Sequence, residues 1–398
     1  MDNRTISQLV RQQKAGHALQ QAFYRDAGIY ERDVQRIYLR SWLYAGHQSE
    51  IPDKGDYFLL NFAGESVIIA RDQEGRIRAL INVCRHRGSR VCLEESGRAS
   101  RLTCRYHGWT YALDGSLRGA SNMPDDFDKA SSGLKSIHVE TFGGMIFVNF
   151  ADTPSAFEPI RRHMESCLRP YRLDECKVAH RQTYPIEANW KLAVENYTEC
   201  YHCTTAHREY ARGHGLALPE EKYADLLHDV MARARTCGLS DERVARMFLD
   251  ADGFGNDCGY ERYPMLHGHL TGSRNGEPVA PLLGEIKDYD GGTTDIQIGP
   301  VTFGLAYCDY VVLYRFTPRT LTASDCDISW LVRGDAEDGR DYDVKELTWL
   351  WDITTIADQH IIEHNQEGVN SRFYEPGPYS KMEFFTQRFV DWYLHALQ

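Results

Sequence analysis

Short apolar runs separated by turns characterise the chain between residues 41 and 153. The clearest runs lie at 57–60, 66–70, 78–83 and 145–150. Runs of this length bounded by turn residues are typical of β-strands, and Asp114-Gly115 is a typical hairpin turn. The pattern therefore predicts a small all-β domain over residues 41–153.

The regions on either side have different patterns. Residues 1–40 are polar with a sparse apolar stripe, which predicts an N-terminal helical segment. Later helices are expected from about Asn189 and near 155–170, 218–250, 342–366 and 380–396, and later strands near 180–186, 296–304, 309–317 and 326–333. Residues 253–299 are rich in Gly and Asp and predict loops. Residues 154–398 are therefore expected to form a second domain.

Composition excludes several classes of protein. The 398 residues carry 45 basic and 57 acidic side chains, and the net charge of −12 argues against a nucleic-acid partner. No apolar run approaches the roughly 18 residues of a membrane span. Because Met1–Ile6 also lacks the apolar core of a signal peptide, we expect a cytoplasmic protein. The cysteine count of 11 is odd and follows no small-domain framework, which argues against disulfides.

Two short segments each offer one cysteine and one histidine. Cys84 and His86 stand in the first, and Cys104 and His107 in the second. A Rieske [2Fe–2S] cluster binds through two cysteines on one iron and two histidines on the other. The alternative is a structural zinc site, although zinc fingers usually pair cysteine with cysteine and histidine with histidine. The mixed pairs favour the Rieske cluster.

The surroundings of these segments are basic although the whole chain is acidic. Residues 71–105 hold nine Arg and four acidic residues, a local balance of +5. Such a surface could steer an acidic electron carrier toward the cluster. Alternatively, the arginines brace the cluster loops and pair with acids elsewhere, and the sequence leaves both interpretations open.

A second metal centre is suggested by His202 and His207. Two histidines five residues apart do not share one face of a straight helix, so a helix must kink or end between them. Two histidines and one carboxylate can hold Fe(II) on one face and leave the other face open for O2 and substrate. Spacing alone does not choose among Asp352, Asp358 and Glu363 in the last long helix.

From about residue 40 to its C-terminal end, the chain resembles the catalytic α subunits of the Rieske non-haem iron oxygenases. The matching features are the two cluster segments, the Glu195-Asn196…Glu199…His202…His207 segment and the Asp358…Glu363…Gln366 helix. The resemblance implies an α+β fold in which an all-β Rieske domain precedes a helix-grip domain, an antiparallel sheet around a long helix. It also implies a mononuclear Fe(II) at His202, His207 and Asp358, with O2 as co-substrate.

The same resemblance implies how the two centres communicate. Members are trimers, some with added β subunits, and an electron crosses from a neighbouring subunit's cluster through a carboxylate three residues before the first iron-binding histidine. Here that residue is Glu199, where the dioxygenases usually have Asp. On a helix, Glu199 and His202 would share a face. The longer side chain leaves its partner distances open.

The substrate class is suggested by a short run. Glu199-Cys200-Tyr201-His202-Cys203 resembles the branch that oxidises quaternary ammonium compounds, namely the choline, betaine and carnitine monooxygenases. Such compounds bind in aromatic cages. Candidate cage residues on the late strands are Phe303, Tyr307, Tyr310, Tyr314 and Trp330. An aromatic ring would fit an apolar pocket of the same residues, and Arg315 and Arg333 leave an aromatic acid open.

The source of electrons must lie outside this chain. It contains neither a Gly-x-Gly-x-x-Gly dinucleotide motif nor the cysteine spacing of a plant-type ferredoxin. We therefore expect a separate NAD(P)H-dependent reductase, with or without a ferredoxin. The expected activity is hydroxylation or oxidative demethylation of a small molecule, with aromatic-ring hydroxylation as the alternative. An electron-transfer protein whose second domain only binds ligand is the rival from another class.

Overall fold

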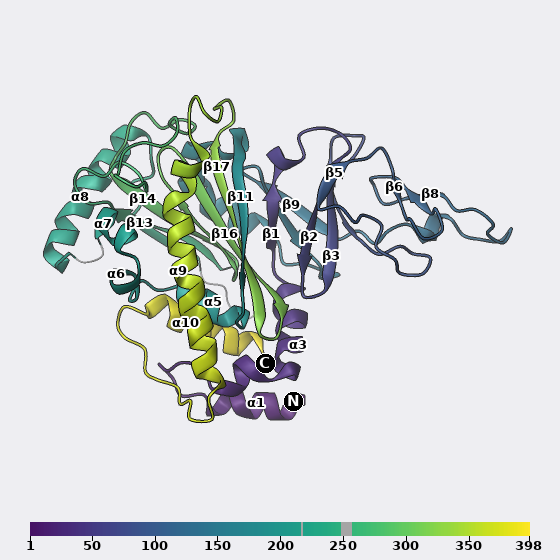
Figure 1. Cartoon of the computed structure of the whole chain (residues 1–398), viewed down its shortest axis with the longest axis horizontal. Helices are drawn as coiled ribbons and strands as arrows, with labels where there is room; N and C mark the ends of the chain where they lie inside the picture. The colour runs from purple at the N-terminus through teal and green to yellow at the C-terminus, as the bar shows by residue number, and fades with distance from the viewer. Residues whose placement is uncertain (216–217, 248–256) are drawn as a thin grey trace. The chain divides into compact units, whose positions relative to one another are not determined.

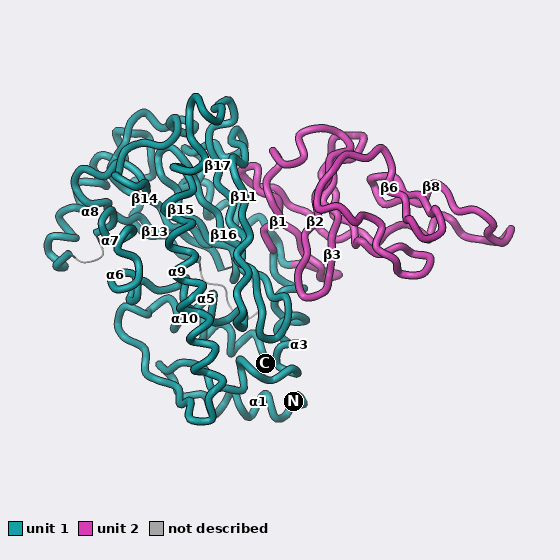
Figure 2. Tube along the Cα trace, in the orientation of Figure 1, with its two compact units in different colours: residues 1–42, 155–398 teal, residues 43–154 magenta. Residues whose placement is uncertain are grey.

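The chain forms two compact units. The computed structural model describes residues 1–215, 218–247 and 257–398. One unit comprises Leu43–Pro154, and the other comprises Met1–Trp42 together with Ser155–Gln398 (Figure 2). The N-terminal segment 1–40, expected to be a separate piece, is therefore part of the unit that contains the second metal centre.

The smaller unit consists of antiparallel strands. These are β1 (Leu43–His47), β2 (Asp56–Phe62), β3 (Glu65–Arg71), β4 (Ile77–Ile81), β5 (Ser96–Arg98), β6 (Leu102–Thr103), β7 (Thr110–Tyr111), β8 (Leu117–Gly119), β9 (His138–Phe142) and β10 (Met145–Asn149). They form sheets in the orders β1-β10-β9, β4-β3-β2-β5 and β6-β7-β8 (Figure 1). The predicted turn at Asp114-Gly115 joins β7 to β8. Cys84 and Cys104 lie in the apolar core beside Trp109, which anchors both cluster segments.

The larger unit combines helices with one sheet. The helices are α1 (Asn3–Gln12), α2 (Gln21–Arg25), α3 (Ala27–Asp33), α4 (Glu158–Leu168), α5 (Trp190–Tyr197), α6 (Cys203–Ala206), α7 (Arg208–Gly213), α8 (Glu220–Cys237), α9 (Val344–Asn370) and α10 (Phe384–Ala396). The strands are β11 (Cys176–Ile186), β12 (Val244–Met247), β13 (Cys258–Pro264), β14 (Gly292–Ile298), β15 (Thr302–Ala306), β16 (Val311–Thr320) and β17 (Ala323–Arg333). Every pairing in the sheet order β11-β17-β16-β15-β14-β13-β12 is antiparallel.

The long helix α9 runs along one face of this sheet (Figure 1). Asp343 caps its N-terminus by accepting the backbone N–H groups of Lys345 and Glu346. The Tyr184 hydroxyl on β11 donates to Asp352 at 2.7 Å and fixes the helix against the sheet. A long helix held against an antiparallel sheet is the expected helix-grip arrangement, and the predicted α+β fold is confirmed.

Two predictions for the middle of the chain are wrong. The helix expected over 218–250 ends at Cys237, because Gly238 adopts a left-handed conformation with φ 89° and terminates it. Strand β12 then begins at Val244. The loops expected over 253–299 contain strands β13 and β14, although residues 248–256 lie outside the described ranges.

Candidate metal centres and substrate pocket

The two cluster segments fold into the same type of tight turn. The backbone N–H of Gly88 donates to the Cys84 carbonyl at 3.0 Å, and that of Gly108 donates to the Cys104 carbonyl at 3.0 Å. Both glycines have positive φ, 78° and 73°, a conformation that other residues rarely adopt. Each turn therefore fixes one buried cysteine at its start.

The histidines of these turns lie at the surface of the chain. The Nδ1 atoms of His86 and His107 face each other at 3.1 Å, and the Trp109 ring stacks on His86 with centroids 4.9 Å apart. On the buried side, the Cys84 sulfur lies 3.2 Å from the Tyr111 hydroxyl. Two buried thiols and two facing imidazole nitrogens are the donor set of a Rieske cluster, so these residues fit the group.

Some of the basic residues around the cluster segments are engaged within the unit, and others are exposed. Arg78 binds the buried Asp72 at 2.7 Å, and Arg98 binds Asp56 at 2.7 Å, so some arginines brace the unit internally. Arg87 and Arg105 are exposed beside the histidines. Arg105 lies 3.9 Å from the exposed Glu94, and steering of an electron carrier by this surface stays a prediction.

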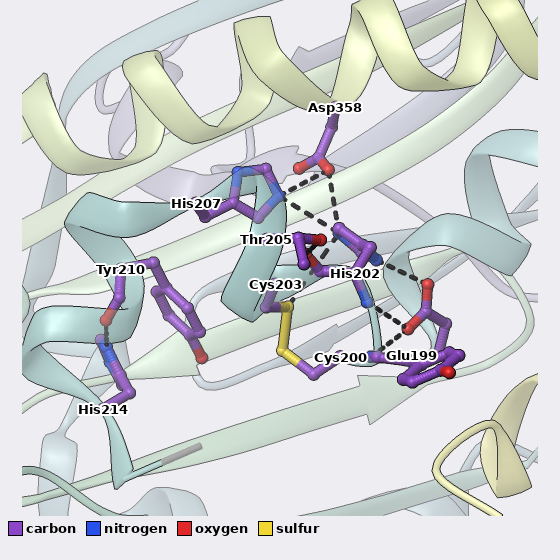
Figure 3. Close-up of a disulfide and its surroundings, with 10 residues drawn as sticks. Glu199, Cys200, His202, Cys203, Thr205, His207, Tyr210, His214 and Asp358 are labelled. Carbon is purple, nitrogen blue, oxygen red and sulfur yellow. Dashed lines mark hydrogen bonds and ion pairs between the residues drawn. A yellow bond between two sulfur atoms is a disulfide. The ribbon is translucent and has the colours of Figure 1, made fainter. Parts of the chain in front are cut away.

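The second centre forms where the chain leaves α5. That helix ends at Tyr197, His202 precedes the one-turn helix α6, and His207 follows it. The chain thus breaks between the two histidines, as their spacing requires. Asp358 projects from α9 toward both imidazoles (Figure 3).

Three potential ligand atoms converge at this centre. The Nε2 atoms of His202 and His207 are 3.1 Å apart, and Asp358 Oδ1 lies 3.2 and 2.9 Å from them. All three atoms lie within 4.8 Å of one another. Three lone-pair donors crowded together favour a shared cation, and two histidines with one carboxylate are the donor set of a non-haem iron site.

The other two candidate carboxylates are engaged elsewhere. Asp352 accepts a hydrogen bond from the Tyr184 hydroxyl, and Glu363 accepts one from the backbone N–H of Glu187 at 3.1 Å. The geometry therefore favours Asp358 over both as the third ligand, a choice that spacing in the sequence could not make.

The electrostatics of the centre favour positive charge. Burial disfavours protonated His202, but hydrogen bonds to Asp358 and Glu199 outweigh it and raise the pKa of His202 to about 9. Burial likewise disfavours ionised Asp358, yet its bonds to His202 and His207 hold the pKa of Asp358 below the ordinary value. The carboxylates beside His202 thus stabilise positive charge at the position where the three potential ligand atoms meet.

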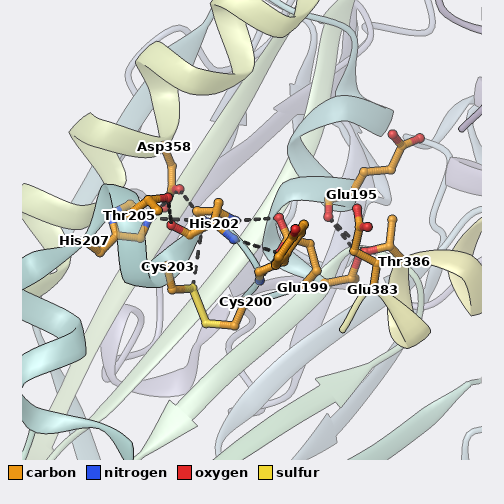
Figure 4. A network of polar contacts seen from close by, with 12 residues as sticks. Glu195, Glu199, Cys200, His202, Cys203, Thr205, His207, Asp358, Glu383 and Thr386 are labelled. Carbon is orange, nitrogen blue, oxygen red and sulfur yellow. Dashed lines mark hydrogen bonds and ion pairs between the residues drawn. A yellow bond between two sulfur atoms is a disulfide. The ribbon is translucent and has the colours of Figure 1, made fainter. Parts of the chain in front are cut away.

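Glu199 contacts His202 through a turn and not along a helix, so the predicted helical relation is wrong. Its Oε1 lies 2.5 Å from His202 Nδ1, while its Oε2 accepts the backbone N–H groups of Tyr201 and His202 (Figure 4). Residues 198–202 follow the end of α5 and turn the carboxylate back onto the imidazole. The Nε2 atom of His202 is consequently directed at the centre.

The prediction that the chain has no disulfide is also wrong. Cys200 and Cys203 form a disulfide, with Cα atoms 4.9 Å apart, on either side of His202 (Figure 3). The number of cysteines indicates whether disulfides could span a whole domain. It gives no information about two cysteines that a local turn brings together. The other nine cysteines, Cys84 and Cys104 among them, are buried thiols.

A cavity of about 270 Å³ includes all three potential ligands in its lining. Among the residues that the structure describes, the aromatic side chains lining the cavity are Tyr197, Tyr210, Tyr223, Tyr263, Phe303, Tyr314, Trp351 and Phe385. Strand register explains part of this wall, because cross-strand partners point to one face of a sheet. Phe303 pairs with Tyr314 on one side and with Gln297 on the other, and all three line the cavity.

The predicted cage residues divide into two groups. Phe303 and Tyr314 line the cavity, whereas Tyr307, Tyr310 and Trp330 are not part of its lining. Tyr307 and Tyr310 are fully buried and stack on each other with centroids 4.9 Å apart. Trp330 is buried next to His180 with ring centroids 5.5 Å apart.

Sequence reasoning missed the charged part of the lining, which consists of Arg246, Glu261 and Asp295 in addition to Glu199 and Asp358. Alternation along β13, where Glu261 and Tyr263 share a face, could have revealed it had that strand been recognised. Neither Arg315 nor Arg333 lines the cavity.

Comparison with known proteins agrees with both centres. Residues 41–142 match the Rieske [2Fe-2S] domain, and residues 173–398 match the catalytic domain of the ring hydroxylating alpha subunit. The chain belongs to the ring-hydroxylating oxygenase α-subunit family. As a member, it is an iron-dependent oxidoreductase with a Rieske cluster, a mononuclear iron and O2 as co-substrate. Oxygenases of this family take electrons from a separate reductase and form oligomers.

Two relatives of this α subunit are monooxygenase subunits. It is 36% identical to the glycine betaine monooxygenase oxygenase subunit of Pseudomonas aeruginosa over 98% of this chain and 91% of that protein. It is also 36% identical to the carnitine monooxygenase oxygenase subunit of Acinetobacter baumannii, over 48% of this chain and 52% of that protein.

Solved structures share the fold of this α subunit. The quaternary ammonium Rieske monooxygenase CntA in complex with an inhibitor matches with a TM-score of 0.75 at 21% identity, covering 98% of both chains. Naphthalene 1,2-dioxygenase from Rhodococcus sp. bound to indole matches with a TM-score of 0.70 at 19% identity, covering 99% of this chain and 98% of that one. Across the described ranges, none of the helices has the length and apolar character needed to cross a bilayer.

Proposed function

We propose that this chain oxidises a small quaternary ammonium compound, hydroxylating an N-methyl group or an adjacent carbon so that the C–N bond breaks. The observation that carries the proposal is the cavity at the triad, whose wall combines aromatic rings with carboxylates. Ring faces attract a cation by about 2 kcal/mol or more in a desolvated site. The relatives named for glycine betaine and carnitine oxidation support the same substrate class.

We assign the metal ligands as follows. The cluster would be held by Cys84, His86, Cys104 and His107, and the mononuclear iron by His202, His207 and Asp358. When both groups are bound, they supply electron storage and O2 activation. Overall, O2, two electrons and two protons convert a trimethylammonium group into a dimethylammonium group, formaldehyde and water.

The protein residues orient this chemistry. Glu199 accepts a hydrogen bond from the Nδ1–H of His202, which fixes the tautomer and leaves Nε2 available to a metal. We further propose that Glu199 links this centre to the cluster of a neighbouring subunit in a homotrimer. The aromatic wall would hold the ammonium group by its ring faces and keep water from the reacting carbon. The trimer, added β subunits, a ferredoxin and the cytoplasmic location remain predictions.

The test is O2 uptake by the protein reconstituted with its reductase. We expect choline, glycine betaine, carnitine or stachydrine to stimulate uptake and to release formaldehyde or another aldehyde in proportion. Asp358→Ala is the control that should keep the cluster spectrum and lose turnover.

Two results would oppose this function. Uptake with benzoate-like or neutral aromatic compounds alone would assign ring hydroxylation instead. No uptake with any compound, by protein that holds the mononuclear iron and a reducible cluster, would favour the electron-transfer alternative.

A further inference from the structure

Three charged side chains on neighbouring strands line the cavity and have no part in the proposed metal sites. Arg246 lies on β12, Glu261 on β13 and Asp295 on β14. Glu261 and Asp295 are direct cross-strand partners, so their side chains share the face that lines the cavity. The register thus gathers these charges, here termed the charged cluster, on one part of the wall.

The contacts within the charged cluster are unequal. Arg246 binds Asp295 at 2.8 Å, and its guanidinium lies 4.9 Å from the centroid of the Phe385 ring. Glu261 accepts only the hydroxyl of Tyr263, at 3.2 Å, and forms no ion pair within the described ranges. One carboxylate is therefore balanced by the arginine, and the other lacks a direct cationic partner.

Arg246 contributes its charge to the cavity wall, and that charge is already balanced. Its side chain is 8% exposed, and its guanidinium binds Asp295 at 2.8 Å. The Nε atom is itself buried, so a ligand in the cavity would meet this residue mainly as one half of an ion pair.

The charge balance indicates which substrate fits. Apart from Glu199 and Asp358 at the metal centre, the described lining carries one guanidinium and two carboxylates, a net charge of −1 when both carboxylates are ionised. A monocation makes this part of the cavity neutral. A betaine adds its own carboxylate and leaves the excess negative charge uncompensated, which is unfavourable in a desolvated site. Burial raises the pKa of Glu261, and the charges of Arg246 and Arg243 oppose this shift only in part, so a bound cation would favour the ionised carboxylate.

We propose that Glu261, together with the Arg246–Asp295 pair, selects a quaternary ammonium monocation whose other polar group is an uncharged oxygen acceptor, such as a hydroxyl, ester or amide, over a carboxylate-bearing betaine. Glu261 compensates the ammonium charge, and the Arg246–Asp295 pair leaves no unpaired cation for a ligand carboxylate. The proposal rests on the proposed function and adds a charge preference that the names of the relatives do not supply.

The test is calorimetric binding to the iron-loaded protein without O2 or reductase. The three probes are choline, glycine betaine and the uncharged tert-butyl analogue of choline. We expect choline to bind about ten-fold or more tightly than either of the others. Glu261→Gln should remove most of this advantage and leave glycine betaine binding unchanged or tighter, whereas Glu261→Asp should restore it. Glu242→Gln removes an acid outside the cavity lining and serves as the matched control.

Several outcomes would overturn the inference. The inference fails if the wild-type protein binds glycine betaine as tightly as choline. This comparison needs no variant, so it remains decisive even if Glu261→Gln fails to fold. If Glu261→Gln weakens the binding of choline and of glycine betaine equally, Glu261 has only a structural role. If betaine binds preferentially and is oxidised, the proposed function stands and only the charge preference fails. If no quaternary compound binds, both fail.

Discussion

At the scale of single residues, Glu199 is unusual because both of its carboxylate oxygens are engaged within four residues of chain. One contacts His202 Nδ1, and the other accepts two backbone N–H groups. The carboxylate therefore fixes the imidazole and the turn that carries it. A negative charge in this position also strengthens the hydrogen bond to the histidine.

The charge of Glu199 should matter more than its size. In Glu199→Gln we expect the cluster and the mononuclear iron to stay bound and the cluster to be reduced normally, because no ligand is removed. Electron arrival at the mononuclear iron should slow at least ten-fold, since a neutral amide weakens the link to the ligating histidine. Rapid-mixing oxidation of the pre-reduced cluster measures this step. A rate equal to that of the wild type would mean that Glu199 only stabilises the local turn and has no part in electron transfer.

Glu195 is a second acid with an unusual environment. The Tyr24 hydroxyl donates to its carboxylate at 2.9 Å, and burial raises the pKa of Glu195 to about 8. Lys191 opposes this shift and Glu383 adds to it, but burial dominates. At neutral pH, the folded protein therefore keeps Glu195 largely protonated.

The stability contribution of Glu195 should fall as pH rises. An unfolded chain releases this proton near the ordinary pKa of 4.5, whereas the folded chain retains it to about 8. The folded state is therefore penalised progressively between these values, by about 1.4 kcal/mol for each pKa unit. We expect the melting temperature of Glu195→Gln to rise relative to that of the wild type as pH increases from about 5 to about 8. A difference that stays constant with pH would contradict the assignment.

At the scale of elements, the tight turns could be predicted better than the pocket. Cys-x-His and Cys-x-x-His specify short turns locally, and the break between His202 and His207 follows from helical spacing. Spacing could not separate Asp358 from Asp352 and Glu363, because the choice depends on how α9 lies against the sheet, and only the family resemblance selected Asp358. Most of the cavity wall was missed for a related reason, since it is set by the register of β12–β16 and strand β13 was not recognised.

The exposed arginines beside the cluster turns should set the rate at which an acidic electron carrier reduces the cluster. Arg87 is exposed, and its guanidinium lies 5.3 Å from the Tyr106 ring beside His107. In Arg87→Glu we expect the second-order rate of cluster reduction to fall about ten-fold at low salt, with the difference shrinking at high salt. Arg162→Glu makes the same charge change at an exposed position of the other unit. Equal effects of both variants would exclude local steering.

At the scale of the whole molecule, a buried ion pair explains why the N-terminal segment belongs to the larger unit. Asp33 on α3 binds Lys191 on α5 at 2.5 Å, and both side chains are fully buried. Asp33 also accepts the Tyr393 hydroxyl on α10 at 2.9 Å. Such tertiary contacts join positions far apart in the sequence, so the pattern of residues 1–40 could predict helices but not where they pack.

Breaking this pair should destabilise the larger unit. Lys191→Met leaves a buried carboxylate without its cation, and removing one partner of a buried pair typically costs about 3–5 kcal/mol. Urea unfolding followed by a probe in this unit measures the loss. Adding Asp33→Asn to that variant should recover part of it. A loss below about 1 kcal/mol in the single variant would mean that the pair contributes little.

The central claim is that the cluster and the triad of His202, His207 and Asp358 together carry out O2-dependent oxidation of a quaternary ammonium compound. A single-turnover experiment tests it most directly: fully iron-loaded protein is reduced without its reductase, freed of reductant and mixed with O2 and substrate. The account predicts cluster oxidation with close to one product molecule per mononuclear iron, and no product from Asp358→Ala despite an intact cluster. Product formed equally by Asp358→Ala, or a cluster that reoxidises in wild type without any C–N cleavage, would contradict it.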